Sequence, residues 1–408
     1  MPPHHKRRVC HPLLRLLLLL APSLLSAMPK TVTHTPIPHS QIGTRHTLQF
    51  HTYEPQGARP ADMKTAYIQA SLHADEIPGL LVVNHLLRKL DEADAAGLIR
   101  GRIIVVPFAN PIGLSQIMLG SHIGRFSFDT ATNFNRDWPD YTTKVVESVK
   151  GRLTSSAADN VAIIRSEILR CIDEDGSMKV DAMMKKILFR EAAVSDMVLD
   201  LHCDTEAVMH LYTHDKLWPE MADLAALLQS RTQLLAPVSG GNAFDEACSC
   251  LWASVQAAFP ESPVPMACQS ATIELRGEVD VFDELAEPDA GALFSFLQHR
   301  GLIAGGRVAL PPLLREATPL SGVDMVEAPV AGVVCWKVRV GDSVSRGQLL
   351  GEIVDIERPG APRTPVLARA DGFVFGVRCH KLVRPGHVII KVSGDRPLDW
   401  RSGNLLTL

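Results

Sequence analysis

The 408-residue sequence has no long basic stretch outside its first fifteen residues, and its formal net charge is −4. Nucleic-acid binding depends on clustered Lys and Arg side chains that neutralise phosphates, so no such partner is expected. The sequence also lacks an apolar run long enough to span a bilayer as a helix of the mature chain. These absences exclude nucleic-acid and membrane partners for the mature chain.

The cysteines are too scattered for a disulfide framework. Eight occur in the whole chain, and seven remain when the N-terminal leader with Cys10 is set aside. An odd number without regular spacing is not typical of a disulfide-stapled secreted protein, and Cys248-x-Cys250 is too tight for a zinc knuckle. This cysteine usage favours a reducing compartment.

Residues 1–27 have the basic and apolar regions of a secretory signal, including the run LLRLLLLLAPSLLSA. However, Arg15 interrupts the apolar run, and Met28 is an alternative initiator. We therefore expect a cytoplasmic protein that starts at Met28. The alternative is export to the periplasm, if residues 1–27 are a functional signal. In both cases these residues form a leader outside the fold.

From about residue 31 to 310, short apolar runs alternate with helical patterns, which indicates an α/β architecture. Apolar spacing predicts a helix that begins at Pro78 and stops near Gly97, and further helices over residues 141–193. Buried strands are predicted to end at His73, Pro111, His202 and Glu274.

Helical periodicity disappears after a Pro-rich segment near Leu310. Residues 328–354 and 368–394 form a weak internal repeat, in which Gly332 matches Gly372. Two such halves predict a small pseudo-symmetric β-barrel or sandwich.

Polar residues at the predicted strand ends suggest a metal site. His73 and Glu76 lie three residues apart in ASLHADEIPG, a spacing that alone fits either a metal site or a solvated pair. His202 alone equally fits a hydrogen-bonded core histidine. Ligands bind beyond the carboxyl ends of strands in open α/β sheets, so the three side chains can converge. Two His and one Glu form a known ligand set of catalytic zinc.

Glu274 follows an otherwise buried apolar run in ATIELRGE. It could be the partner of nearby Arg276. Alternatively, it could take a proton from a water and pass it to a leaving amine, as metal-assisted hydrolysis requires.

The stretch NFNRDWPD offers a substrate anchor. Asn135 and Arg136 combine an amide with a planar guanidinium, which suits a substrate carboxylate. The alternative is a loop arginine paired with Asp137 or Asp140. Arg125, in a polar loop upstream, could stabilise the oxyanion of a scissile carbonyl.

Together, HADE, Asn135-Arg136, DLHCD and IELRGE resemble the succinylglutamate desuccinylase/aspartoacylase family of zinc carboxypeptidase-like hydrolases, over roughly residues 65–278. The resemblance implies a mixed sheet flanked by helices and one Zn²⁺ per chain. Many family members carry Gly where this chain has Ala74, a change expected to leave the ligands in place. The implied roles are zinc ligation by His73, Glu76 and His202, general base and acid catalysis by Glu274, carbonyl polarisation by Arg125, and substrate-carboxylate binding by Asn135 and Arg136.

The C-terminal repeat is similar to the β-barrel of biotinyl/lipoyl carrier domains. Carriers hold their prosthetic group on a Lys between the two halves, but the connection DIERPGAPRTPVLA contains no lysine. We therefore expect this barrel to shape or cover the active-site mouth. The expected division is a leader at 1–27, a zinc hydrolase domain at 28–318, a β-barrel at 319–395 and a tail at 396–408.

The resulting hypothesis is a zinc-dependent amidohydrolase of linear amides other than peptide bonds. It would remove the acyl group from a small N-acyl amino acid or related carboxylated substrate. Two alternatives stay open: a zinc carboxypeptidase acting on short peptides, and a non-enzymatic binding or carrier module. The acyl group, the amine and a homo-oligomeric state are also open. Side chains in residues 115–132, 204–216 and 240–262 are expected to set specificity.

Overall fold

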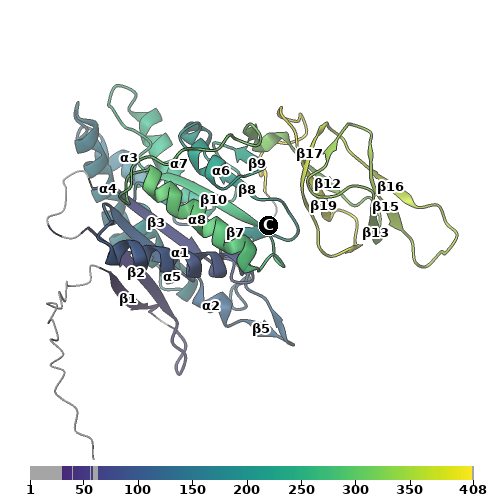
Figure 1. The fold of residues 1–408 in the computed structure, drawn as a ribbon, viewed down its shortest axis with the longest axis horizontal. Coiled ribbons are helices and arrows are strands. Elements are labelled where there is room, and N and C mark those ends of the chain that lie inside the picture. Colours follow the sequence, from purple (N-terminus) through teal and green to yellow (C-terminus); the bar gives the residue numbers. More distant parts are fainter. Residues whose placement is uncertain (1–29, 39, 56, 58–62, 407–408) are drawn as a thin grey trace, which may run out of the picture.

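The computed structural model describes residues 30–38, 40–55, 57 and 63–406, so the expected leader at 1–27 lies outside the described residues. A large sheet is covered by helices, and two smaller sheets lie to one side of it (Figure 1). Among the described residues, no helix combines the length and apolar character needed to cross a lipid bilayer.

The large sheet is mixed, as predicted. Its order is β1 (Thr31–Pro36), β2 (Thr47–Tyr53), β4 (Arg102–Val106), β3 (Thr65–Ala70), β7 (Met197–Asp204), β10 (Gln269–Gly277), β8 (His210–Thr213), β9 (Thr232–Leu235) and β11 (Thr318–Pro319). Strands β4, β3, β7 and β10 are parallel, whereas β2 and β8 run antiparallel to their neighbours β4 and β10.

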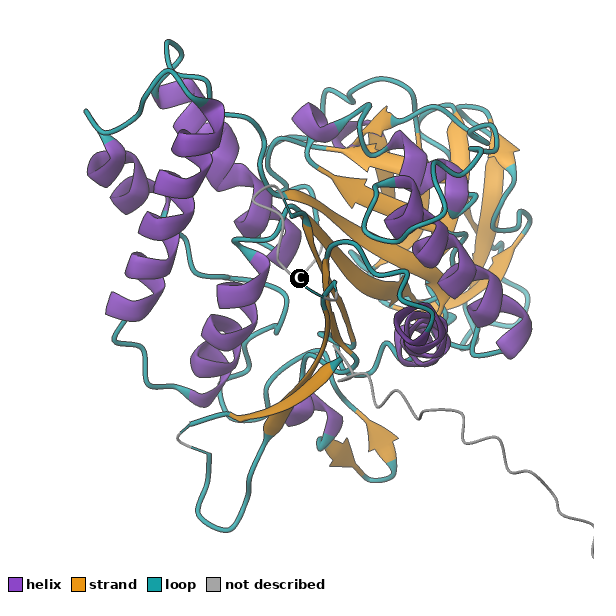
Figure 2. Cartoon of the chain, turned by 60° about the vertical axis from the view of Figure 1, so that its left-hand side comes forward, coloured by secondary structure: helices purple, strands orange, loops and turns teal. Residues whose placement is uncertain are grey.

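The central strands are apolar on both faces because helices cover both faces (Figure 2). Side chains alternate along each strand, so Tyr67 belongs to the hydrophobic cluster that includes residues of α3, α4, α5 and α7, whereas Ile68 belongs to the cluster that includes residues of α1, α6 and α8. The helices are α1 (Pro78–Ala95), α3 (Thr142–Val149), α4 (Ala157–Glu174), α5 (Val180–Ala192), α6 (Ala222–Leu227), α7 (Phe244–Ala258) and α8 (Asp283–His299). Shorter elements are α2 (Pro111–Leu114), the β5–β6 hairpin (Ile117–Met118, Ser121–His122) and the 3₁₀ turns η1 (Asp215–Leu217) and η2 (Leu320–Gly322). The predicted helices after Pro78 and within residues 141–193 are confirmed.

Two predicted strands end earlier than expected. Strand β3 stops three residues before His73, because Ser71 adopts a left-handed φ of 61° and turns the chain. Strand β4 stops at Val106 and does not reach Pro111, because Pro107 has no N–H to donate to the sheet.

Two other predicted strands continue past their expected ends. Strand β7 runs beyond His202 to Asp204, and β10 runs beyond Glu274 to Gly277. The extension pairs Gly277 with Asp204 across a register shift, where Arg276 has a φ of 66°. His202 and Glu274 therefore lie within strands, and the neighbouring strands hold their backbones in place.

The C-terminal β-region (residues 323–393) shows the predicted repeat. Strands β13 (Gly332–Trp336), β14 (Ser343–Val344) and β15 (Leu349–Val354) recur as β17 (Gly372–Val377), β18 (Leu382–Val383) and β19 (Val388–Ser393), with β12 (Val323–Glu327) and β16 (Thr364–Leu367) preceding the two sets. The two sheets have the orders β12-β19-β17-β14 and β16-β15-β13-β18. The short strand β14 of the first half thus pairs with β17 of the second half, and the short strand β18 of the second half pairs with β13 of the first half. Leu350 and Ile390 pack in the hydrophobic core between the two sheets.

Candidate active site

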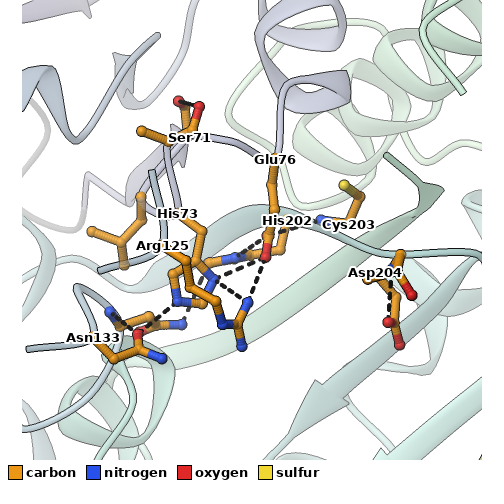
Figure 3. Close-up of polar contacts among 12 residues, drawn as sticks. Ser71, His73, Glu76, Arg125, Asn133, His202, Cys203 and Asp204 are labelled. Carbon is orange, nitrogen blue, oxygen red and sulfur yellow. Dashed lines mark hydrogen bonds and ion pairs between the residues drawn. The ribbon is translucent and has the colours of Figure 1, made fainter. Parts of the chain in front are cut away.

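The three candidate ligands converge at the carboxyl ends of neighbouring parallel strands. His73 and Glu76 lie in the turn between β3 and α1, and His202 lies on β7, which pairs with β3 (Figure 3). One potential ligand atom from each residue lies within 4.8 Å of the others, and all three side chains are buried.

Both imidazoles direct Nδ1 at the Glu76 carboxylate and Nε2 at a second oxygen. The distance from Glu76 Oε1 to His73 Nδ1 is 2.9 Å, and that from Oε2 to His202 Nδ1 is 2.7 Å. On the far side of each ring, His73 Nε2 lies 2.7 Å from Asn133 Oδ1, and His202 Nε2 lies 2.9 Å from Asp200 Oδ2. Metal-binding histidines are typically oriented in this way, with the other ring N–H donated to an oxygen.

The chemistry of these donors fits a divalent cation. An imidazole lone pair and a carboxylate oxygen repel each other at hydrogen-bond distance unless a proton or a cation lies between them. Burial lowers the pKa of His73, which favours the neutral ligand form. Burial also acts to lower the pKa of His202, but Asp200 and Glu76 outweigh it and raise this pKa well above its usual range. Each position between Nδ1 and Glu76 is therefore suited to a positive charge.

The turn that carries His73 is closely packed. Ala74 is fully buried, and its N–H donates to the carbonyl of Gly124 at 3.1 Å. A Cβ on Gly124 would lie 2.3 Å from the backbone N of Asp75, and one on Gly113 would lie 2.8 Å from the Ala74 methyl. These two glycines make room for the alanine and hold the turn against its neighbours.

Glu274 lies beside the cluster with one oxygen unused. Strand pairing places it next to His202, and its Oε2 is buried without a hydrogen-bond partner. Burial and the neighbouring Glu76 carboxylate raise the pKa of Glu274 to about 8. Arg276 forms an ion pair with Asp289, so the alternative reading of Glu274 as an arginine partner is wrong. A buried carboxyl group with a pKa near neutrality is suited to accept and release a proton.

The other predicted site residues surround the same cavity. Arg125 donates from Nη1 to Glu76 Oε1 at 2.9 Å, and Arg136 donates from Nη1 to the carbonyl of Asn135 at 2.7 Å. The Asn135 side chain accepts from the Phe244 N–H at 2.9 Å, and its Nδ2 lies 3.4 Å from His202 Nε2. Asn135 and Arg136 thus both line the cavity, and both side chains also contact other protein groups.

Several residues of the cavity carry no distinctive sequence signal. They are Ser239, Tyr212, Asp245, Glu246, Cys250, Leu320, Met325, Lys391 and Leu406. Acidic residues such as Asp245 and Glu246, at the start of α7, are ordinary for a helix N-terminus, so the pattern alone does not select them. Tyr212, Asp245, Glu246 and Cys250 do fall within the segments 204–216 and 240–262, where specificity residues were expected.

The C-terminal β-region is joined to the chain that leaves β7. The Val208 N–H donates to the Phe375 carbonyl at 2.9 Å, and the Val377 N–H donates to the Glu206 carbonyl at 2.8 Å. Lys391 on β19 forms an ion pair with Asp204, whose side chain is 12% exposed. These contacts bring the C-terminal β-region to the wall of the cavity.

The last described residues also reach the cavity. The Leu405 N–H donates to the Ser239 carbonyl at 2.7 Å, and Leu406 lines the cavity. A Cβ on Gly240 would lie 2.8 Å from the Cα of Asn404, so the two segments are in direct contact.

Lys391→Met is expected to lower the free energy of unfolding by about 2–3 kcal/mol, because it leaves the largely buried Asp204 carboxylate without its cation, although the Thr205 N–H still donates to Oδ1. The measurement is urea unfolding followed by circular dichroism. The matched control is Lys381→Met, whose partner Glu206 is 51% exposed. That change is expected to cost less than about 1 kcal/mol. Equal effects of the two substitutions would contradict the role given to the Asp204 pair.

Comparison with solved structures shows which fold this chain shares. Over most of its length, the chain has the mixed α/β fold of several solved structures. A protein assigned to the succinylglutamate desuccinylase/aspartoacylase family, from Shewanella amazonensis SB2B, has a TM-score of 0.78 and 23% identity, with 89% of this chain and 98% of that chain covered. The product-bound ectoine utilization protein EutE (DoeB) from Ruegeria pomeroyi has a TM-score of 0.62 and 19% identity, with 90% and 98% covered.

The sequence comparisons bear on the family that the chain resembles. The model of the succinylglutamate desuccinylase/aspartoacylase catalytic domain matches residues 62–162. The N-alpha-acetyl-L-2,4-diaminobutyric acid deacetylase of Halomonas elongata is 22% identical over 344 residues, which cover 81% of this chain and 82% of that protein. The resemblance to the succinylglutamate desuccinylase/aspartoacylase family is thereby confirmed. The matched segment includes His73, Glu76, Arg125 and Arg136.

Proposed function

We propose that this protein is a zinc-dependent amidohydrolase that removes the acyl group from an N-acyl amino acid or a related small carboxylated substrate. The observation that carries the proposal is the convergence of His73, Glu76 and His202 beside the unpartnered carboxylate of Glu274. The confirmed family resemblance supports an amide deacylase. The Halomonas relative is named as the deacetylase of a small N-acetylated amino acid, which fits the same reaction class.

His73, Glu76 and His202 would hold one Zn²⁺ per chain. When bound, zinc supplies a Lewis acid that polarises a carbonyl and lowers the pKa of a water molecule. Asn133 and Asp200 keep the Nε2–H groups of the two histidines occupied, so Nδ1 is the atom that each ring presents.

The side chains around the cluster would transfer the proton, stabilise the developing negative charge and bind the substrate. Glu274 would take a proton at its free oxygen from the attacking water and then deliver it to the amine nitrogen as the C–N bond breaks. Arg125 would donate to the oxygen of the former carbonyl as negative charge develops there. Arg136 would bind a substrate carboxylate, and Asn135 would hold the segment that presents Arg136.

We propose that the C-terminal β-region is a biotinyl/lipoyl-like barrel, with domains at 28–318 and 319–395 and a tail at 396–408. The exchange of β14 and β18 between the two halves supports this architecture. No lysine occurs between the halves, and Met325, Lys391 and Leu406 line the cavity, so the region would act by shaping the cavity.

The function is tested with purified zinc-loaded protein and a panel of N-acetyl, N-succinyl and N-formyl amino acids, beside short unacylated peptides. Release of the free amino acid from at least one N-acyl derivative, with slower or absent peptide cleavage, is the expected result. Faster peptide cleavage would favour the carboxypeptidase alternative. An intact-mass increase by a biotinyl or lipoyl group would revive the carrier alternative.

Arg136→Lys is expected to raise KM by about 10–100-fold with a smaller change in kcat. Lysine keeps the positive charge but loses the planar fork that binds a carboxylate with two parallel hydrogen bonds. Steady-state kinetics on the best substrate of the panel measures both constants. Arg307→Lys, at an exposed position outside the cavity, serves as the control. An unchanged KM in Arg136→Lys would rule out carboxylate binding by this residue.

A further inference from the structure

The deep part of the cavity carries more negative than positive charge. Of its cations, Arg125 is paired with Glu76, and Lys391 is paired with Asp204. Two further carboxylates, Asp245 and Glu246, line the same cavity on the first turn of α7. Among the residues that the structure describes, no ion pair joins either of these two carboxylates to a cation.

Asp245 and Glu246 differ from the usual acidic residues at a helix start, because both are buried. Their exposed fractions are 7% and 9%, whereas acidic residues that serve the helix dipole are ordinarily solvated. Glu246 uses Oε1 to accept the backbone N–H of Ser239, and its Oε2 is buried without a partner. Burial and the adjacent Glu246 raise the pKa of Asp245 to about 7.

A neutral side chain gives an independent sign of a missing ligand. Ser239 is 3% exposed and lines the cavity, and its Oγ is also buried without a hydrogen-bond partner. Unpartnered buried polar atoms are rare in folded proteins, and each calls for an explanation. Here two of them, on Ser239 and Glu246, belong to residues joined to each other by the hydrogen bond from the Ser239 N–H to Glu246 Oε1.

We propose that Asp245, Glu246 and Ser239 form a cation subsite that binds a free ammonium group on the amine part of the substrate. An ammonium group has three donors and no acceptor, which complements two carboxylates and a hydroxyl. The inference rests on the proposed deacylase function and makes it specific, because the preferred substrates become N-acyl diamino acids.

The proposed subsite lies in the same cavity as Arg136. Asp245 and Glu246 act electrostatically on the Arg136 guanidinium, which places the three charges in one part of the cavity. A diamino acid carries a carboxylate and a second ammonium a few bonds apart, so it can meet Arg136 and the acidic pair together. An acidic side chain would instead face two carboxylates and be repelled.

The test compares three substrates of nearly equal length with the zinc-loaded full-length protein: Nα-acetyl-L-ornithine, N-acetyl-L-norvaline and N-acetyl-L-glutamate. Norvaline has the ornithine carbon chain without the ammonium group. The value of kcat/KM for the ornithine derivative is expected to exceed that for the norvaline derivative by at least about tenfold, with the glutamate derivative slowest. A ratio of one or below would overturn the subsite.

Substitutions then assign the preference to these residues. Glu246→Gln and Asp245→Asn are each expected to lower the ornithine-to-norvaline ratio of kcat/KM by about tenfold. Glu261→Gln, which removes an exposed carboxylate, leaves that ratio unchanged. A ratio that stays at the wild-type value in both folded cavity variants would overturn the assignment.

A binding measurement separates this inference from the proposed function. If none of the three derivatives is hydrolysed, the proposed function is wrong, but calorimetric titration with L-ornithine and L-norvaline still decides the subsite. Ornithine binding at least about tenfold tighter than norvaline binding, and weakened in Glu246→Gln, supports it. Equal or absent binding of the two amino acids contradicts it.

Discussion

Glu274→Gln is expected to keep one equivalent of zinc per chain and to lower kcat by about 10²–10⁴-fold. The substitution preserves the size of the side chain but removes the group that takes a proton from water and returns it to the leaving amine. Because Glu274 is not one of the three converging ligand residues, the metal content should not change. Elemental analysis gives the zinc content, and amine release gives kcat.

The matched control for this prediction is Glu278→Gln. Glu278 lies four residues further along the chain, is exposed and does not line the cavity that holds Glu274. Its loss is expected to change kcat by less than about fivefold, because it takes no part in proton transfer. An unchanged kcat in Glu274→Gln would contradict the proposed mechanism, irrespective of the result for Glu278→Gln.

His202→Ala should lose both bound zinc and activity, with kcat/KM reduced by at least about 10³-fold. The substitution removes one of three ligand atoms and also leaves Glu76 Oε2 without its closest partner, at 2.7 Å. Chelation of wild-type protein is expected to abolish turnover in the same way, and added Zn²⁺ should restore it. Zinc content and activity are measured on the same samples.

A second histidine distinguishes ligand loss from a general effect of removing a buried imidazole. His85 is also buried and lies 2.8 Å from a carboxylate oxygen of Asp283, but it is not among the residues that line the cavity. His85→Ala is expected to retain zinc. Activity that survives full chelation, with zinc absent by elemental analysis, would show that the cluster has no catalytic metal.

The sequence predicts the sheet, the helices and the motif residues for local reasons. Apolar periodicity marks β3 and α1, and side chains such as His202 and Glu274 are conspicuous within apolar runs. The predicted strand ends were less accurate, because they depend on single backbone choices. Ser71 turns the chain with a positive φ, and Pro107 has no N–H to donate to the neighbouring strand.

The rest of the candidate site could not be predicted, because it depends on tertiary packing. Lys391 is far from Asp204 in the sequence and meets it when β19 packs beside the end of β7. Glu246 and Ser239 look ordinary until the fold buries them and leaves an oxygen of each without a partner. The Arg276–Asp289 pair, which frees Glu274, likewise appears when α8 packs on β10.

The position of Leu406 bears on how the protein should be prepared for these assays. Leu406 is two residues from the end of the 408-residue sequence, and it lines the cavity. An affinity tag fused to the C-terminal side of Leu406 is expected to perturb the contact between Leu405 and Ser239. A tag before Thr31 would join the chain at β1, an edge strand of the large sheet (Figure 1). Kinetic constants from a C-terminally tagged protein would therefore describe a cavity that the tag itself had altered.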